Sequence, residues 1–240
     1  MRAYWQDSRK PRYSLLLALP LFIIYQVLEA LEPTTRGGGL RNGADVILES
    51  LFYRVAGPRG PLLFMVCLVA VGLWLVIRDY HKSGRELHFS VLLLMLAEAT
   101  VLALSLGIIV SAITSQLVRP TAMLQQSVEK MATSTKLMLS LGAGLYEELL
   151  FRVLLVGSLA WAGKRVLGLR PLMAGVWAAL IGALIFSAFH YVGPYGDRLS
   201  AYSFVFRTIA GLAFSALFLL RGFGITAWTH ALYDAFLLLR

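Results

Sequence analysis

Long apolar stretches separated by short polar turns dominate the hydropathy pattern of this chain. A helix needs about 20 predominantly apolar residues to cross a bilayer, so stretches of this length are typical of transmembrane helices. The pattern therefore predicts an all-α, polytopic transmembrane bundle of about seven spans, within a range of six to eight. The predicted spans are 13–31, 61–78, 89–113, 136–162, 171–190, 202–220 and 225–239, the last being short for a full crossing.

The polar segments divide these spans without dividing the chain into separate domains. Residues 32–60 read as a glycine-rich loop with an interfacial helix near 44–56, and residues 114–135 as a polar, partly helical surface segment. The first span ends in V-L-E-A-L-E-P, a poor cleavage site, and therefore reads as a retained anchor. We expect a single integral membrane domain over residues 1–240.

Composition supports the membrane assignment and excludes some function classes. Hydrophobic residues make up 58% of the chain and charged residues only 15%, with a mean hydropathy of +0.73. A net charge of +9 fits loop lysines and arginines near anionic lipid headgroups. No basic and aromatic patch lies outside the spans, so nucleic acid is not an expected partner. The single cysteine, Cys67, excludes an intramolecular disulfide and a cysteine-rich zinc site.

The basic residues favour one orientation only weakly, because lysines and arginines are divided almost evenly between the two sides. A dense cluster at the N-terminus (Arg2, Arg9, Lys10 and Arg12) and a basic linker at 164–170 fall on the same side. The positive-inside rule then places the N-terminus in the cytoplasm.

Ionisable residues inside predicted spans are costly and indicate function by default. The first such cluster is Y-E-E-L-L-F-R, with Glu147, Glu148 and Arg152. Glu148 and Arg152 are four residues apart, so they share a helix face and can form an ion pair, which is a sufficient structural explanation for both. Glu147 lies about 100° around the helix and has no partner in its own helix.

Two further clusters follow on later spans. Phe186 and His190 share one helix face, and so do His230 and Asp234. Taken singly, His190 is explained as an interfacial residue and the His230–Asp234 pair as a local hydrogen bond. Glu98, in the third span, reads as a helix-packing or cavity residue.

The three clusters together suit one chemistry. A free carboxylate, two histidines and a second carboxylate can activate a water molecule and stabilise an oxyanion. The same groups could bind zinc, although the H-E-x-x-H spacing of common zinc proteases is absent. Because a metal-free site is chemically sufficient, we expect no metal and no other cofactor. Simple spans place His190 near one membrane face and His230 nearer the other, so convergence requires one helix to begin at another depth.

The order of these motifs resembles a known family. E-E-x-x-x-R, then F-x-x-x-H, then H-x-x-x-D on successive apolar helices is similar to the CPBP family, the type II CAAX prenyl proteases and bacteriocin-processing intramembrane proteases, also called ABI proteins. The resemblance covers residues 136–238, and the first three spans carry no signature.

The resemblance implies a glutamate-dependent intramembrane endopeptidase with its site among the C-terminal four helices. Glu147 and His190 would activate the attacking water, and His230 and Asp234 would form or support the oxyanion site. Glu148 and Arg152 would hold the helix and the local charge, and Phe186 would pack beside the site.

The last motif departs from the family pattern. It ends in Asp234 where the better-known prenyl proteases carry asparagine, and an ionised carboxylate cannot donate a hydrogen bond to an oxyanion. We therefore expect Asp234 to orient and charge His230. The only asparagine of the chain is Asn42, and its distance along the sequence predicts that no asparagine lies near the site.

The expected substrate is a membrane-associated peptide or protein, either of the CAAX type or a bacterial precursor, and the expected location is the bacterial inner membrane. One alternative is a non-proteolytic membrane partner, such as an immunity or scaffold protein with the same fold. A transporter is less favoured, because the ionisable residues gather in one half and no inverted repeat is visible. The sequence leaves the substrate, the oligomeric state and the role of the first three spans open.

Overall fold

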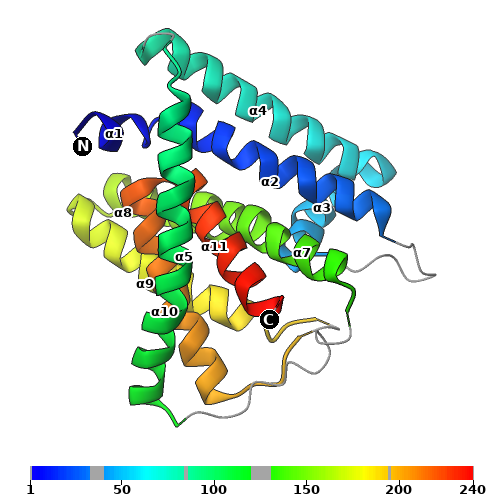
Figure 1. The fold of residues 1–240 in the computed structure, drawn as a ribbon, viewed down its shortest axis with the longest axis vertical. Helices are drawn as coiled ribbons and strands as arrows, with labels where there is room; N and C mark the ends of the chain where they lie inside the picture. The colour runs from blue at the N-terminus through cyan, green and yellow to red at the C-terminus, as the bar shows by residue number, and fades with distance from the viewer. Residues whose placement is uncertain (1, 33–40, 84–85, 120–130, 194–195, 240) are drawn as a thin grey trace.

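The computed structural model describes residues 2–32, 41–83, 86–119, 131–193 and 196–239, and the regular structure in these ranges is helical throughout (Figure 1). This confirms the predicted all-α bundle. The elements are α1 (Arg2–Asp7), α2 (Pro11–Leu31), α3 (Gly43–Ala56), η1 (Gly57–Arg59), α4 (Gly60–Ser83), α5 (Phe89–Leu117), α7 (Thr133–Gly142), η2 (Ala143–Val156), α8 (Gly157–Arg165), α9 (Pro171–Phe189), α10 (Ala201–Arg221) and α11 (Phe223–Leu238).

Within the described residues, five segments are long and apolar enough to cross a membrane: α2, the segment Gly43–Lys82, α5, α9 and α10. The chain is therefore an integral membrane protein. The two remaining predicted spans carry the first and the third of the charged clusters, with Glu147, Glu148 and Arg152 in one and His230 and Asp234 in the other. One is divided into α7, η2 and α8, and the other is α11, with 16 residues.

Helix positions agree closely with the hydropathy pattern. The helix expected near 44–56 is α3, and the sixth and seventh predicted spans correspond to α10 and α11. The polar segment 114–135 is only partly described, because residues 120–130 lie outside the described ranges. Within it, α5 continues to Leu117 and α7 begins at Thr133.

The apolar outer surface is what a lipid-facing bundle requires. On α4, Val66, Leu73 and Trp74 are each more than half exposed. Figure 1 shows α4 beside α2 at one edge of the molecule, while α5 crosses in front of α10 and α11, which it contacts. Because lipid is itself apolar, such side chains carry no penalty on this surface.

The segment η2 is a π-helix, with α7 and α8 continuing it at either end. The π-helix is rare, appears mostly as single-turn bulges inside α-helices, and is frequent at functional sites. Here it includes Glu147, Glu148 and Arg152, all of which are buried. The unusual backbone thus coincides with the buried charges.

Glycines allow η2 and its neighbours to approach closely. A Cβ atom at Gly144 would lie 2.3 Å from the carbonyl oxygen of Ala227 and 2.6 Å from Cβ of Ala231. Backbone therefore packs directly on backbone where η2 meets α11, and a larger residue would separate the two helices that carry the charged motifs.

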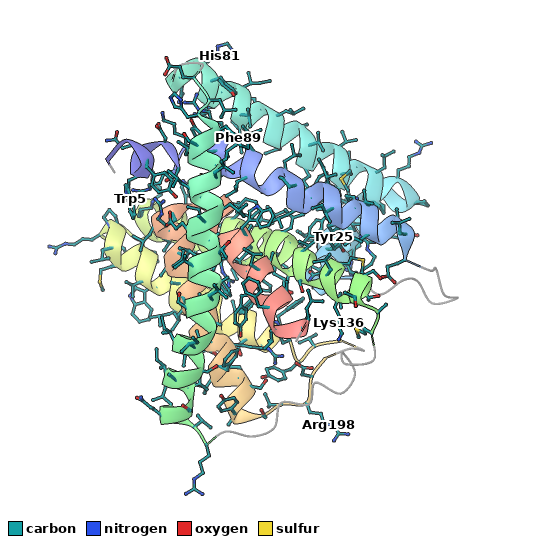
Figure 2. The ribbon with its side chains drawn as sticks, viewed as in Figure 1. Trp5, Tyr25, His81, Phe89, Lys136 and Arg198 are labelled. Carbon is teal, nitrogen blue, oxygen red and sulfur yellow. The ribbon has the colours of Figure 1, made fainter. Side chains whose placement is uncertain are left out.

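A polar cluster fastens the N-terminal helix to the bundle. Arg221, at the end of α10, binds both carboxylate oxygens of Glu98 on α5, at 2.7 and 2.6 Å. The Tyr4 hydroxyl donates to the same carboxylate at 2.5 Å, and the Arg221 guanidinium lies 4.0 Å from the ring centre of Trp5, which Figure 2 labels on α1. Glu98 is therefore a helix-packing residue, as the sequence predicts.

The close approach at Gly144 gives a direct test of the fold. We expect Gly144→Ala to lower the free energy of unfolding by about 2 kcal/mol or more, because overpacking against backbone cannot be relieved by a rotamer change. The matched control is Gly72→Ala on α4, where a Cβ meets no atom within 4 Å. This control should be neutral or slightly stabilising. Thermal unfolding of both variants in detergent checks the prediction, and equal midpoints would contradict it.

Candidate active site

The three charged motifs meet where η2, α9, α10 and α11 pack together. Phe186 of α9 lies at the centre, with its ring 4.9 Å from that of His190 and 6.2 Å from that of His230, measured between ring centres. His190 and His230 therefore lie at one site, although simple spans place them near opposite membrane faces. His190 caps the end of α9, whereas His230 lies in the middle of α11, which begins directly after α10 at the turn of Gly222.

Glu148 and Arg152 form the predicted ion pair, with 3.2 Å between Oε2 and Nε and both side chains fully buried. The guanidinium also lies 4.5 Å from the ring centre of Phe186 and 5.7 Å from that of Phe214. Among the described residues its nitrogens have no partner that meets hydrogen-bond geometry. The ion pair and the two aromatic rings therefore offset the free-energy cost of burying the Arg152 cation.

His230 is bound by Glu148. Its Nδ1 lies 2.7 Å from Glu148 Oε1, while its Nε2 lies 3.6 Å from Asp234 Oδ2, too far for a hydrogen bond. The local His230–Asp234 hydrogen bond considered from the sequence is thus not formed. Glu148, and not Asp234 as the sequence led us to expect, holds the ring by a hydrogen bond. Phe214 stacks on the ring at 4.4 Å between ring centres.

Glu147 faces different partners. One carboxylate oxygen, Oε1, accepts a hydrogen bond of 2.9 Å from Nδ2 of Asn42. The other, Oε2, lies 4.0 Å from Nε2 of His190. The expectation that no asparagine lies near the site is therefore wrong, because the start of α3 packs against η2 and brings Asn42 to Glu147.

The hydrogen bonding of His190 defines its tautomer. Nδ1 lies 2.9 Å from the backbone carbonyl oxygen of Phe186, which can only accept a hydrogen bond, so Nδ1 carries a proton. In the neutral ring Nε2 is then an acceptor, and it faces the carboxylate of Glu147.

Among the residues that the structure describes, no group of three or more His, Cys, Asp or Glu side chains is placed to hold a metal ion. Glu148 and the Phe186 carbonyl each engage Nδ1 of one histidine, which leaves Nε2 of both rings available to a substrate or a water molecule.

An apolar groove with a volume of about 390 Å³ runs along η2 and α9 beside these residues. Its lining includes Phe151 and Phe189, whose rings pack 5.2 Å apart between centres. Phe189 also lies 6.0 Å from the ring of His190, so the groove is adjacent to the charged site.

Sequence reasoning missed Asn42 and Phe214. Asn42 lies 105 residues before Glu147, and nothing in the pattern links them. The one available signal was that Asn42 directly precedes a predicted helix, where asparagine is a favoured cap. Phe214 is one of several apolar residues on α10, and no sequence feature distinguishes it.

Residues 130–236 match the family described as Rce1-like, type II CAAX prenyl endopeptidase Rce1-like. The matched range includes all three charged motifs, and it begins after the first three predicted spans. The search of curated proteins gives no match, and the search of solved structures gives none.

Removal of the arginine from the buried Glu148–Arg152 ion pair should strongly lower the stability of the protein. We expect Arg152→Met to destabilise the protein by about 3–5 kcal/mol, because it leaves the Glu148 carboxylate buried without its cation. The control, Arg165→Met, removes an exposed arginine at the end of α8 and should change stability by about 0.5 kcal/mol or less. Thermal unfolding in detergent measures both, and similar midpoints for the two variants would contradict the prediction.

Proposed function

We propose that the chain hydrolyses a peptide bond of a membrane-associated substrate, with Glu147 and His190 as its water-activating pair. The match of residues 130–236 to the type II CAAX prenyl endopeptidase family supports this proposal. One observation carries the proposal. Oε2 of Glu147 and Nε2 of His190 face each other across 4.0 Å, with Glu147 buried and His190 partly exposed. Both are acceptors when His190 is neutral, and a gap of this size suits a water molecule that donates to each.

The reaction follows from this placement. Glu147 takes a proton from the water as its oxygen attacks the scissile carbonyl carbon, which forms a tetrahedral oxyanion. The same proton then passes to the amide nitrogen as the carbon–nitrogen bond breaks, leaving a new carboxyl group and a new amine. General base catalysis of this kind contributes about 10²- to 10⁴-fold to a rate.

His230 is the proposed donor to the oxyanion. Its Nδ1 is held by Glu148, and its Nε2 makes no hydrogen bond to Asp234 at 3.6 Å. An imidazolium at this position has one N–H free to donate, with two carboxylates nearby to stabilise its charge. Asp234 thus supports His230 instead of contacting the oxyanion itself.

The substrate is proposed from the surroundings of the site. The groove lined by Phe151 and Phe189 is almost wholly apolar, and it adjoins His190. We propose that it receives apolar side chains next to the cleaved bond, in a CAAX-type tail or a bacterial precursor peptide. The proposed location is the bacterial inner membrane, with the N-terminus in the cytoplasm.

The central test is cleavage by purified protein in mild detergent. We expect the wild-type protein to cleave members of a library of membrane-associated peptides, and Glu147→Gln to lower kcat by at least about 100-fold, because the amide cannot accept the proton of water. Mass spectrometry of the products identifies the cleaved bond, which should be flanked by apolar side chains.

Glu86→Gln is the matched control for this experiment. Glu86 is 88% exposed on the turn before α5, and its substitution should leave kcat unchanged. Equal cleavage by the wild-type protein and Glu147→Gln would reject Glu147 as the base. Absence of cleavage by the wild-type protein would favour a non-proteolytic partner protein.

Metal independence follows as a separate prediction. The proposed chemistry uses side chains alone, so kcat should be unchanged after exhaustive chelation and dialysis. The measurement is the cleavage rate before and after treatment, with zinc added back afterwards. A rate that is lost on chelation and restored by zinc would overturn the metal-free mechanism.

A further inference from the structure

We propose that Asn42 is a positioning residue of the active site, which holds one oxygen of Glu147 so that the other faces His190. This inference rests on the proposed function and extends it. Asn42 precedes the range that matches the family, and it stands at the start of α3. The N-terminal half would then complete the site as well as the fold.

The orientation of the Asn42 amide is fixed by its second contact. Asn42 is the N-cap of α3, and its Oδ1 accepts hydrogen bonds from the backbone nitrogens of Ala44 at 2.9 Å and Asp45 at 3.4 Å. A backbone N–H can only donate, so the atom facing the helix must be the oxygen. The atom facing Glu147 is therefore the NH₂ group, a donor to the carboxylate.

The start of α3 is itself held in place by charge. Arg41 forms ion pairs with Glu29 of α2 at 2.7 Å, with Asp45 at 2.6 Å and with Glu49 at 2.7 Å. Burial lowers the pKa of Arg41, but the hydrogen bond to Glu49 and the charges of Asp45 and Glu29 outweigh it, so the pKa is raised and the cation persists. The residue directly before Asn42 thus links α2 to α3.

Packing fixes the same position from the other side. A Cβ at Gly142 would lie 2.6 Å from the ring of Tyr25 and 2.8 Å from Cβ of Asn42. The Tyr25 hydroxyl also donates to Asp45 at 2.7 Å, and Figure 2 shows Tyr25 on α2. Asn42 is 6% exposed and has little freedom to move, so a donor placed there can restrain Glu147.

The restraint matters because Glu147 has two equivalent oxygens and a flexible side chain. With Oε1 held at 2.9 Å by Asn42, only Oε2 remains for the gap to His190. Loss of the donor would free the carboxylate to rotate away from that gap. Misplacement of a catalytic group by about 1 Å costs up to about 10²-fold in rate.

Substitutions can separate this role from helix capping. Serine caps helices about as well as asparagine, but it has no amide group to donate to Glu147. We expect Asn42→Ser to keep the thermal midpoint within a few degrees and to lower kcat by about 10- to 100-fold with KM little changed. Wild-type kcat in this variant, in a protein that cleaves peptide, would overturn the proposal.

A second readout does not depend on activity. Asn42 is the only asparagine of the chain, so selective ¹⁵N-asparagine labelling gives one pair of side-chain NH₂ signals in a nuclear magnetic resonance spectrum. We expect this pair to shift in Glu147→Gln and to stay unchanged in Glu86→Gln. An unshifted pair in Glu147→Gln would reject the contact. If no peptide is cleaved by the wild-type protein, the proposed function fails, while this spectrum still judges the Asn42 contact.

Discussion

The buried carboxylate of Glu148 is the group on which the rest of the site depends. Its two oxygens bind Arg152 of the same helix and His230 of α11, and none of the three is more than 5% exposed. A buried ion is tolerated only with good geometry and satisfied neighbours, so each partner requires the others. The aromatic rings of α9 and α10 that cover Arg152 extend the same requirement to all four C-terminal segments.

Sequence spacing predicted the part of this network that lies within single helices. Residues four apart share a face in a helix, and this relation gave the Glu148–Arg152 pair and placed His230 beside Asp234. Hydropathy likewise gave the helices and most of their ends, because the bilayer imposes a length on each span.

Spacing within a helix and hydropathy do not predict which side chains of different helices are in contact. The choice of Glu148 over Asp234 as the partner of His230 depends on how closely η2 approaches α11 at Gly144, and no periodicity encodes that approach. The same holds for Asn42, which a tertiary contact brings to Glu147 across 105 residues of sequence. The π-helical backbone of η2 was also not predicted, because its sequence has the pattern of an ordinary apolar helix.

The two adjacent glutamates differ in how many of their carboxylate oxygens are engaged, and this difference is the reason that we propose only Glu147 as the base. Glu148 has both oxygens engaged, one by Arg152 and the other by His230, and is fully buried. Glu147 has one oxygen engaged by a neutral amide and the other open toward His190 across 4.0 Å. An amide orients a carboxylate without neutralising it, whereas an arginine does both. Environment thus divides two identical side chains into a structural anion and a candidate base, a pattern known from paired carboxylates in other enzymes.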